Sequence, residues 1–156
     1  MTNSTNATPT NSNFIEIGDY DASIHREILN ALLRADADTY DPQIIEICED
    51  RAIAEMRGYI SKSYDSEAIF AARGAERHPL ILMFALDIAI YHIFCQHNPY
   101  KISKIREERY KRAVEWLKGV MKGDVTIEGA PHLPEAVVAD NSPWQIQSDD
   151  VRPVVL

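Results

Sequence analysis

Short catalytic and metal-binding motifs are scarce in this sequence of 156 residues. Its only cysteines, Cys48 and Cys95, lack the CxxC spacing of zinc and redox sites. His78, His92 and His97 form no HExxH pattern, and the six glycines are isolated, so they make neither a phosphate-binding loop nor a GxSxG elbow. We therefore predict a protein that is not an enzyme and that binds no metal or cofactor.

Positively charged residues are outnumbered: the chain has 16 lysines and arginines and 24 aspartates and glutamates, which gives a net charge of −8. This balance opposes a simple nucleic-acid-binding role, which usually shows a basic footprint.

Both cysteines lie in apolar helical patterns, which favours free thiols in a reducing compartment over a disulfide. The N-terminus lacks the basic and apolar pattern of a signal peptide, so we expect a cytoplasmic product.

One long apolar run stands out, at residues 78–97 (HPLILMFALDIAIYHIFCQH). Its apolar side chains occupy every direction around a helical period, which is typical of a helix buried on all sides. Pro79 fits the first helical turn. A membrane span is the alternative, but the run is short, and Asp87 near its middle would cost about 3 kcal/mol in lipid. We therefore predict the central core helix of a soluble bundle.

Three longer amphipathic helices are expected around this core helix. Apolar residues recur at helical spacing over residues 22–34, 42–62 and 103–122, with Asp41 and Pro42 as a start signal and Gly123 as a stop. A short helix is expected at residues 66–72, capped by Asp65 or Ser66 and ended by a left-handed Gly74. The sequence therefore predicts an all-α fold, a small bundle of about four helices around a buried central helix.

Two of these helices have faces that can be assigned. We expect the charged face of the helix at 42–62 to lie in solvent; it carries Glu46, Glu49, Asp50, Arg51, Glu55 and Arg57. The helix at 103–122 is basic, with seven lysines and arginines against three glutamates. Its expected buried stripe comprises Ile102, Ile105, Ala113, Trp116, Leu117 and Val120.

Both ends of the chain differ from the middle. Residues 1–13 are polar and of low complexity, whereas residues 124–156 hold four prolines and six acids against one arginine. We therefore divide the chain into a polar N-terminal arm (1–13), a helical domain (14–123) and an extended C-terminal arm (124–156), with disorder as the alternative for the last. Apolar residues near both ends are candidate anchors on a neighbouring subunit or partner, the first three also on the bundle itself: Phe14, Ile15, Ile17, Val125, Ile127, Trp144, Ile146, Val154, Val155 and Leu156.

Asp87 needs a partner, because a lone carboxylate in a core helix must be paired or hydrogen-bonded, or else become neutral. Arg109 projects within the apolar stripe of the last helix rather than opposite it. We predict a buried ion pair between Asp87 and Arg109 that fixes the register of the two helices.

Two strings resemble a known family. DIAIYHIF (residues 87–94) resembles the core helix of Mu-like phage neck proteins, and RYKRAVEWLKGVMKGDVTI (109–127) is similar to the ending of their last helix. The segment at 65–80 stands in place of the shorter loop common in that family. The resemblance covers about residues 14–127. The proteins that the chain resembles are the head–tail connector, or adaptor, proteins of tailed phages.

This resemblance implies a structural virion protein without catalytic residues. Such connectors are helical bundles that form a homo-oligomeric ring of about twelve copies in the phage neck, between the portal protein and the tail or stopper protein, and DNA passes through without sequence-specific contact. Their C-terminal arms hold neighbouring subunits or the portal. Two alternatives stay open: another virion protein, such as a tail terminator or minor capsid component, and a DNA-binding module that uses the basic helix. No membrane partner is expected.

Overall fold

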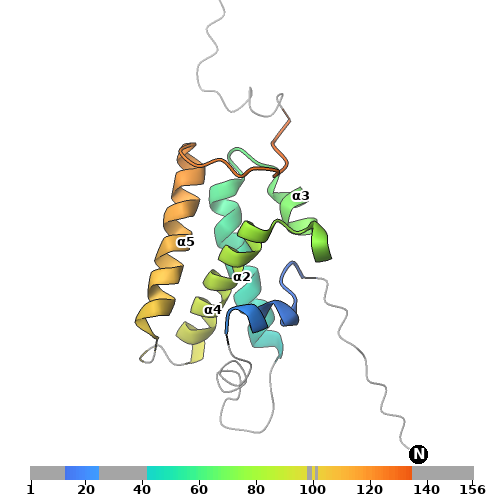
Figure 1. The fold of residues 1–156 in the computed structure, drawn as a ribbon. Helices are drawn as coiled ribbons and strands as arrows, with labels where there is room; N and C mark the ends of the chain where they lie inside the picture. The colour runs from blue at the N-terminus through green and yellow to red at the C-terminus, as the bar shows by residue number, and fades with distance from the viewer. Residues whose placement is uncertain (1–12, 25–41, 98–99, 101, 135–156) are drawn as a thin grey trace, which may run out of the picture.

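The computed structural model describes residues 13–24, 42–97, 100 and 102–134, and within them the all-α prediction is confirmed (Figure 1). Most of the helix expected at 22–34 lies outside these residues. The elements, in chain order, are the 3-10 helix η1 (Ile17–Ala22), α2 (Pro42–Ile60), α3 (Ser66–Ala71), the 3-10 helix η2 (Gly74–Glu76), α4 (Pro79–His97) and α5 (Lys104–Lys122).

The apolar run forms α4, the central helix of the bundle. It packs against both α2 and α5, and nearly all of its middle is buried, from Phe84 to Ile90. Among the described residues, α4 alone is long and apolar enough to span a membrane by length and composition, and half of that stretch is buried inside the bundle. The predicted core helix is therefore confirmed, with Pro79 at its first position as expected.

Helix α2 buries Ile45, Cys48, Ala52, Met56 and Ile60. The prediction that the charged face of α2 lies in solvent is wrong for two of its residues. Glu49 is buried because residues 13–24 cover it, and Glu55 is half-buried because it hydrogen-bonds to side chains of α4 and α5. Neither contact follows from helical periodicity within α2.

Helix α5 matches its predicted bounds and caps. The Ser103 hydroxyl accepts a hydrogen bond from the Arg106 amide, and Gly123 ends the helix at φ 87°. Ala113, Leu117 and Val120 are buried, but Ile105 is 64% exposed, so its place in the buried stripe is wrong. Ile105 lies in the first turn and on the edge of that stripe, where the position one residue later, Arg106, turns inward.

The segment between α2 and α4 contains the expected short helix. The Asp65 carboxylate accepts a hydrogen bond from the Ala68 amide at 3.0 Å and so caps α3. Gly74 is left-handed (φ 57°), as predicted, but it does not end α3. The helix already stops at Ala71, because Ala72 turns to an extended conformation, and Gly74 instead opens η2.

Residues 13–24 pack onto the bundle as an irregular segment with η1 in its middle. Phe14, Ile15 and Tyr20 are almost completely buried. The Phe14 ring meets the Phe70 ring of α3 edge to face, with centroids 5.1 Å apart. This segment is therefore part of the core.

Residues 124–134 also belong to the packed body, so the boundary predicted at Gly123 is too early. Ile127 is buried, and its amide donates a hydrogen bond to the Tyr64 hydroxyl at 2.8 Å. The Asp65 amide donates to the Pro131 carbonyl at 2.9 Å, next to an isolated bridge between Tyr64 and His132. The chain after α5 thus returns across the bundle toward α3 (Figure 1).

Two glycines within helices predict opposite effects of the same substitution. A Cβ at Gly119 would meet Val125 Cγ2 at 2.8 Å, whereas nothing lies within 4 Å of one at Gly58. Alanine is favoured over glycine in a helix by about 1 kcal/mol. We therefore expect Gly58→Ala to raise the free energy of unfolding by about that amount, and Gly119→Ala to lower it by about 1 kcal/mol through overpacking. Urea denaturation of both variants measures the difference; equal gains would contradict the close contact with Val125.

Candidate functional site

Asp87 lies at the boundary of α4 and α5 and is 2% exposed. Arg109 Nη1 is 3.6 Å from Asp87 Oδ1, so the structure brings the two predicted partners together. A second arginine, Arg112, places Nη2 3.4 Å from Asp87 Oδ2. The Arg109 and Arg112 side chains are 42% and 57% exposed, so a buried anion is held by two cations at the surface.

Arg106 is a third cation near the same carboxylate. Its Nη2 donates a hydrogen bond to the Ser23 carbonyl, whereas Nη1 is buried and finds no hydrogen-bond partner among the described residues. Burial, and then repulsion from Arg109, lowers the pKa of the Arg106 guanidinium, with attraction from Asp87 opposing both. Three arginines therefore surround one carboxylate, which leaves a local excess of positive charge.

Apolar side chains border this cluster. The Arg112 guanidinium lies over the Phe84 ring, 5.7 Å from its centroid, and Phe84 in turn packs against Trp116 at 4.7 Å. Leu80 and Met83, one turn before Phe84 and Asp87 on α4, are each 37% exposed. The result is a surface on which positive charge and apolar area are adjacent, as at many protein interfaces.

A second polar cluster joins the three long helices. Glu55 of α2 accepts a hydrogen bond from the Tyr110 hydroxyl at 2.9 Å and lies 3.1 Å from His92 Nε2. The Tyr110 ring stacks on Tyr91 with centroids 4.0 Å apart. Burial and the bond to Glu55 raise the pKa of the Tyr110 hydroxyl, which therefore stays protonated as a donor. The contacts of Glu55 with His92 and Tyr110 thus hold α2, α4 and α5 in place relative to one another.

Glu49 of α2 is a second acidic residue buried in the core, at 3% exposure. The Tyr20 hydroxyl donates a hydrogen bond to it at 2.7 Å, and the Asn13 amide approaches at 3.4 Å. Burial raises the pKa of Glu49 to about 7, although both hydrogen bonds act in the opposite direction. Glu49 therefore joins residues 13–24 to α2 in a pH-dependent way.

The free energy of unfolding is expected to fall as the pH rises from about 4.5 to about 7, because folded Glu49 keeps a proton that the unfolded chain has released. The full effect is about 3 kcal/mol. Glu49→Gln removes this dependence, because an amide stays neutral and still accepts from Tyr20. Denaturant titrations at several pH values, with Glu46→Gln as the exposed control, test this. Parallel wild-type and Glu49→Gln profiles would contradict it.

Arg77, between α3 and α4, fastens residues 13–24 to the bundle. Its side chain is 8% exposed. The guanidinium donates to the Phe14 carbonyl at 2.9 Å and to both Asp19 carboxylate oxygens, while Nε donates to the Gly74 carbonyl. The hydrogen bond to Asp19 raises the pKa of this arginine. No pattern in the sequence predicts this contact, because its partners are about 60 residues apart.

Most predicted anchor residues that the structure describes do not face outward. Phe14 and Ile15 are buried on their own bundle, one of the two places expected for them, whereas Ile127 is buried in its own chain and not available to a neighbouring subunit. Val125 packs against the core, and Ile17 alone of this set is exposed, at 40%. The remaining anchors lie outside the described residues: Trp144, Ile146, Val154, Val155 and Leu156.

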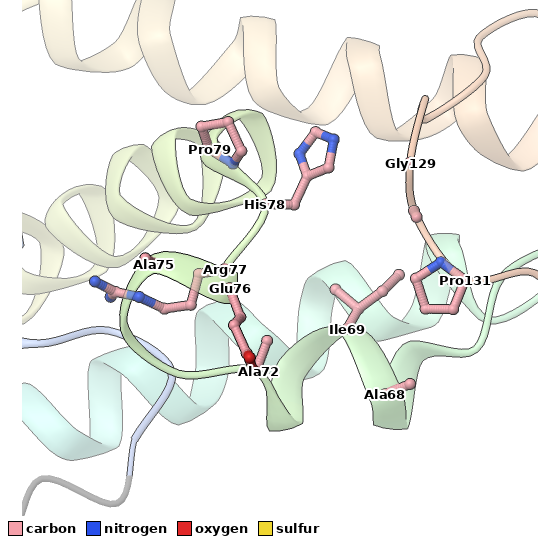
Figure 2. Close-up of a pocket in the computed structure, with 11 residues that line it drawn as sticks. Ala68, Ile69, Ala72, Ala75, Glu76, Arg77, His78, Pro79, Gly129 and Pro131 are labelled. Atoms are coloured by element: carbon pink, nitrogen blue, oxygen red, sulfur yellow. The ribbon is translucent and has the colours of Figure 1, made fainter.

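One pocket of about 320 Å³ lies between α3, the residues before α4 and the segment after α5 (Figure 2). Its walls are mainly small or apolar, with Ala68, Ile69 and Ala72 facing Gly129 and Pro131. His78, at its edge, is occupied by a hydrogen bond with the Glu128 carbonyl at 2.9 Å. The pocket thus presents no nucleophile with an adjacent base.

Comparison with known proteins gives one match. The family model described as "Bacteriophage Mu, Gp36" matches residues 16–143, which include every helix that the structure describes. No curated protein and no solved structure matches the chain.

Proposed function

We propose, because this chain belongs to the bacteriophage Mu Gp36 family, that it is the head–tail connector of a phage neck. The family makes it a Mu-like phage protein with a structural or morphogenetic role. The proposal goes further: copies form a ring, of about twelve, between the portal protein and the tail or stopper protein. The chain would be made in the host cytoplasm and would end in the virion, with no catalytic role.

The observation that carries the proposal is the family match across residues 16–143. The architecture supports it. Three helices of 19 residues pack on one another, and the segments before α2 and after α5 are fastened to them by buried groups. A ring subunit needs such a body, because small contacts repeated around a ring add up only if each subunit keeps its shape.

Charge supports the same role. The net charge of −8 disfavours tight binding of DNA that must slide through a channel. Residues 135–156 stay candidate arm residues, and their acids complement the exposed lysines of α5 on a neighbouring copy. Contacts of this head-to-tail kind close into rings.

Cryo-electron microscopy of virion necks tests the proposal directly: density for a ring of this chain is expected between portal and tail. In solution, light scattering should detect a ring mainly when the portal protein is present. Density for the chain at the far end of the tail, or in the capsid shell, would instead favour a tail terminator or a minor capsid component.

A DNA-binding role is the second candidate, favoured by one observation. Lys104, Lys111 and Lys118 are exposed and lie seven residues apart, so they form a row along α5. Glu108 and Glu115 lie beside this row and reduce its charge. Retention of the isolated protein on DNA that falls steeply with salt would support this role and contradict the proposal of an inert ring.

A further inference from the structure

The bundle has two exposed faces of opposite charge that each surround apolar side chains. The arginine face consists of Leu80 and Met83 on α4 with Arg109 and Arg112 on α5. The acidic face consists of Glu46, Ile47 and Asp50 on α2. We propose that the acidic face of one copy binds the arginine face of the next copy, and that this contact builds the ring. The inference rests on the proposed function, since it assigns the surfaces through which copies assemble.

The arginine face has more positive charge than its own chain neutralises. Asp87 is the carboxylate that Arg109 and Arg112 contact, and Arg106 adds a third positive charge behind them. With these contacts, at 3.6 and 3.4 Å, roughly half of each of the two arginine side chains stays in solvent. Two donors held by Asp87 in a fixed place, with room for a second acceptor, suit a carboxylate from a partner.

Apolar area lies beside these charges. Leu80 and Met83 are one turn from Phe84 and Asp87, the two residues that Arg112 contacts. An exposed apolar patch rimmed by charge is a common sign of a protein interface. A free anion or a nucleic acid phosphate would leave the leucine and methionine uncovered, so a protein surface fits this face better.

The acidic face has the complementary composition. Ile47 is 49% exposed, one of the most exposed large apolar residues among those that the structure describes. Glu46 and Asp50 are also exposed and are four residues apart, so both carboxylates project from the same side of α2 next to Ile47. Arg51, also exposed, lies one turn after Ile47 on its other side, and the two carboxylates outnumber it. Arg109 and Arg112 are likewise one turn apart on α5. Each face therefore offers two like charges one helical turn apart with exposed apolar side chains beside them.

The two faces point in different directions from the bundle. Helix α2 turns Ile45, Cys48 and Met56 inward, toward α4, so Glu46 and Asp50 project away from α4 and α5. The arginine face is built from α4 and α5, and Figure 1 shows α5 on the side of the bundle away from α3. A contact between unlike faces of identical copies is heterologous, and such a contact either closes into a ring or continues as a filament.

Cysteine cross-linking with the full chain and the portal protein of the same phage tests the contact. One protein carries Ile47→Cys and the other Met83→Cys, and the two are mixed with portal under oxidising conditions. The expected result is a mixed dimer, and a ladder when both substitutions lie in one chain. Ile47→Cys mixed with Lys118→Cys, which is exposed on a different side of α5, is the matched control and should give little product.

A charge experiment gives an independent readout. Glu46→Lys with Asp50→Lys should raise the apparent Kd of assembly on the portal by about tenfold or more, since two close charge pairs become repulsive. Asp124→Lys with Glu128→Lys makes the same charge change at exposed positions after α5 and should have an effect within about twofold. Circular dichroism checks that both variants keep their helices.

The outcomes separate this inference from the proposed function. Rings on the portal without the cross-link between positions 47 and 83, or with unchanged assembly of the α2 variant, would overturn the inference and leave the connector role intact. A cross-link from Met83→Cys to Trp144→Cys instead would show that the acidic C-terminal residues occupy the arginine face, which also overturns it. Failure of the wild-type chain to assemble on the portal would overturn both.

Discussion

Arg77→Ala is expected to lower the free energy of unfolding by about 3 kcal/mol, because it leaves the half-buried Asp19 carboxylate without its cationic partner. The Phe14 carbonyl loses its donor as well. Since Phe14, Ile15 and Tyr20 are buried only while residues 13–24 lie on the bundle, the segment should detach before α2, α4 and α5 separate. Denaturant unfolding gives the energy, and limited proteolysis reports the detachment.

The lysine variant makes this prediction specific. Arg77→Lys keeps the charge but cannot contact both Asp19 oxygens and two carbonyls at once, so we expect it to recover only part of the lost stability. Arg51→Ala, an exposed arginine of α2, is the control and should change stability by no more than about 0.5 kcal/mol. If Arg77→Ala and Arg51→Ala had equal effects, the proposed clamp would be wrong.

The second large effect is expected from Arg109 and Arg112 together. Replacing either arginine alone by methionine should cost less than about 1 kcal/mol, because both are about half exposed and the other still holds Asp87. Replacing both leaves Asp87, at 2% exposure, with neither of its salt-bridge partners, and should cost about 3 kcal/mol. The double variant is therefore expected to lose more than the sum of the single losses.

A double-mutant cycle measures this coupling. Thermal or urea unfolding of wild type, Arg109→Met, Arg112→Met and the double variant gives the four values. Lys111→Met, which lies between them in sequence but is exposed on another side of α5, provides the control. Simple additivity would show that the two arginines do not share the carboxylate.

The three long helices and their ends were predictable because local chemistry determines them. Ser103 and Gly123 delimit α5, Pro79 opens α4, and Asp65 caps α3. The Asp87 contact with Arg109 was also predictable, since it needs only one charge in an apolar helix and one within an apolar stripe. Arg112 was missed because it projects from the edge of that stripe and reaches inward with a long side chain.

Contacts between segments far apart in the chain were not predictable. Periodicity places Glu49 on the polar face of α2, and only the packing of Tyr20, from 29 residues earlier, buries it. The same holds for Ile127, which reads as part of an arm until the Tyr64 hydroxyl accepts its amide proton. In both cases a tertiary contact overrides the local pattern, because burial depends on what covers a residue as well as on its own helix.

The segment at 63–78 has a mechanical consequence. Phe70 and Arg77 hold the residues that precede α2, whereas Tyr64, Asp65 and His78 hold those that follow α5. Tension applied to the chain before residue 13 and tension applied after residue 134 would therefore both reach this segment. A pull on either end would load the same short stretch of chain before it reached α4 or α5.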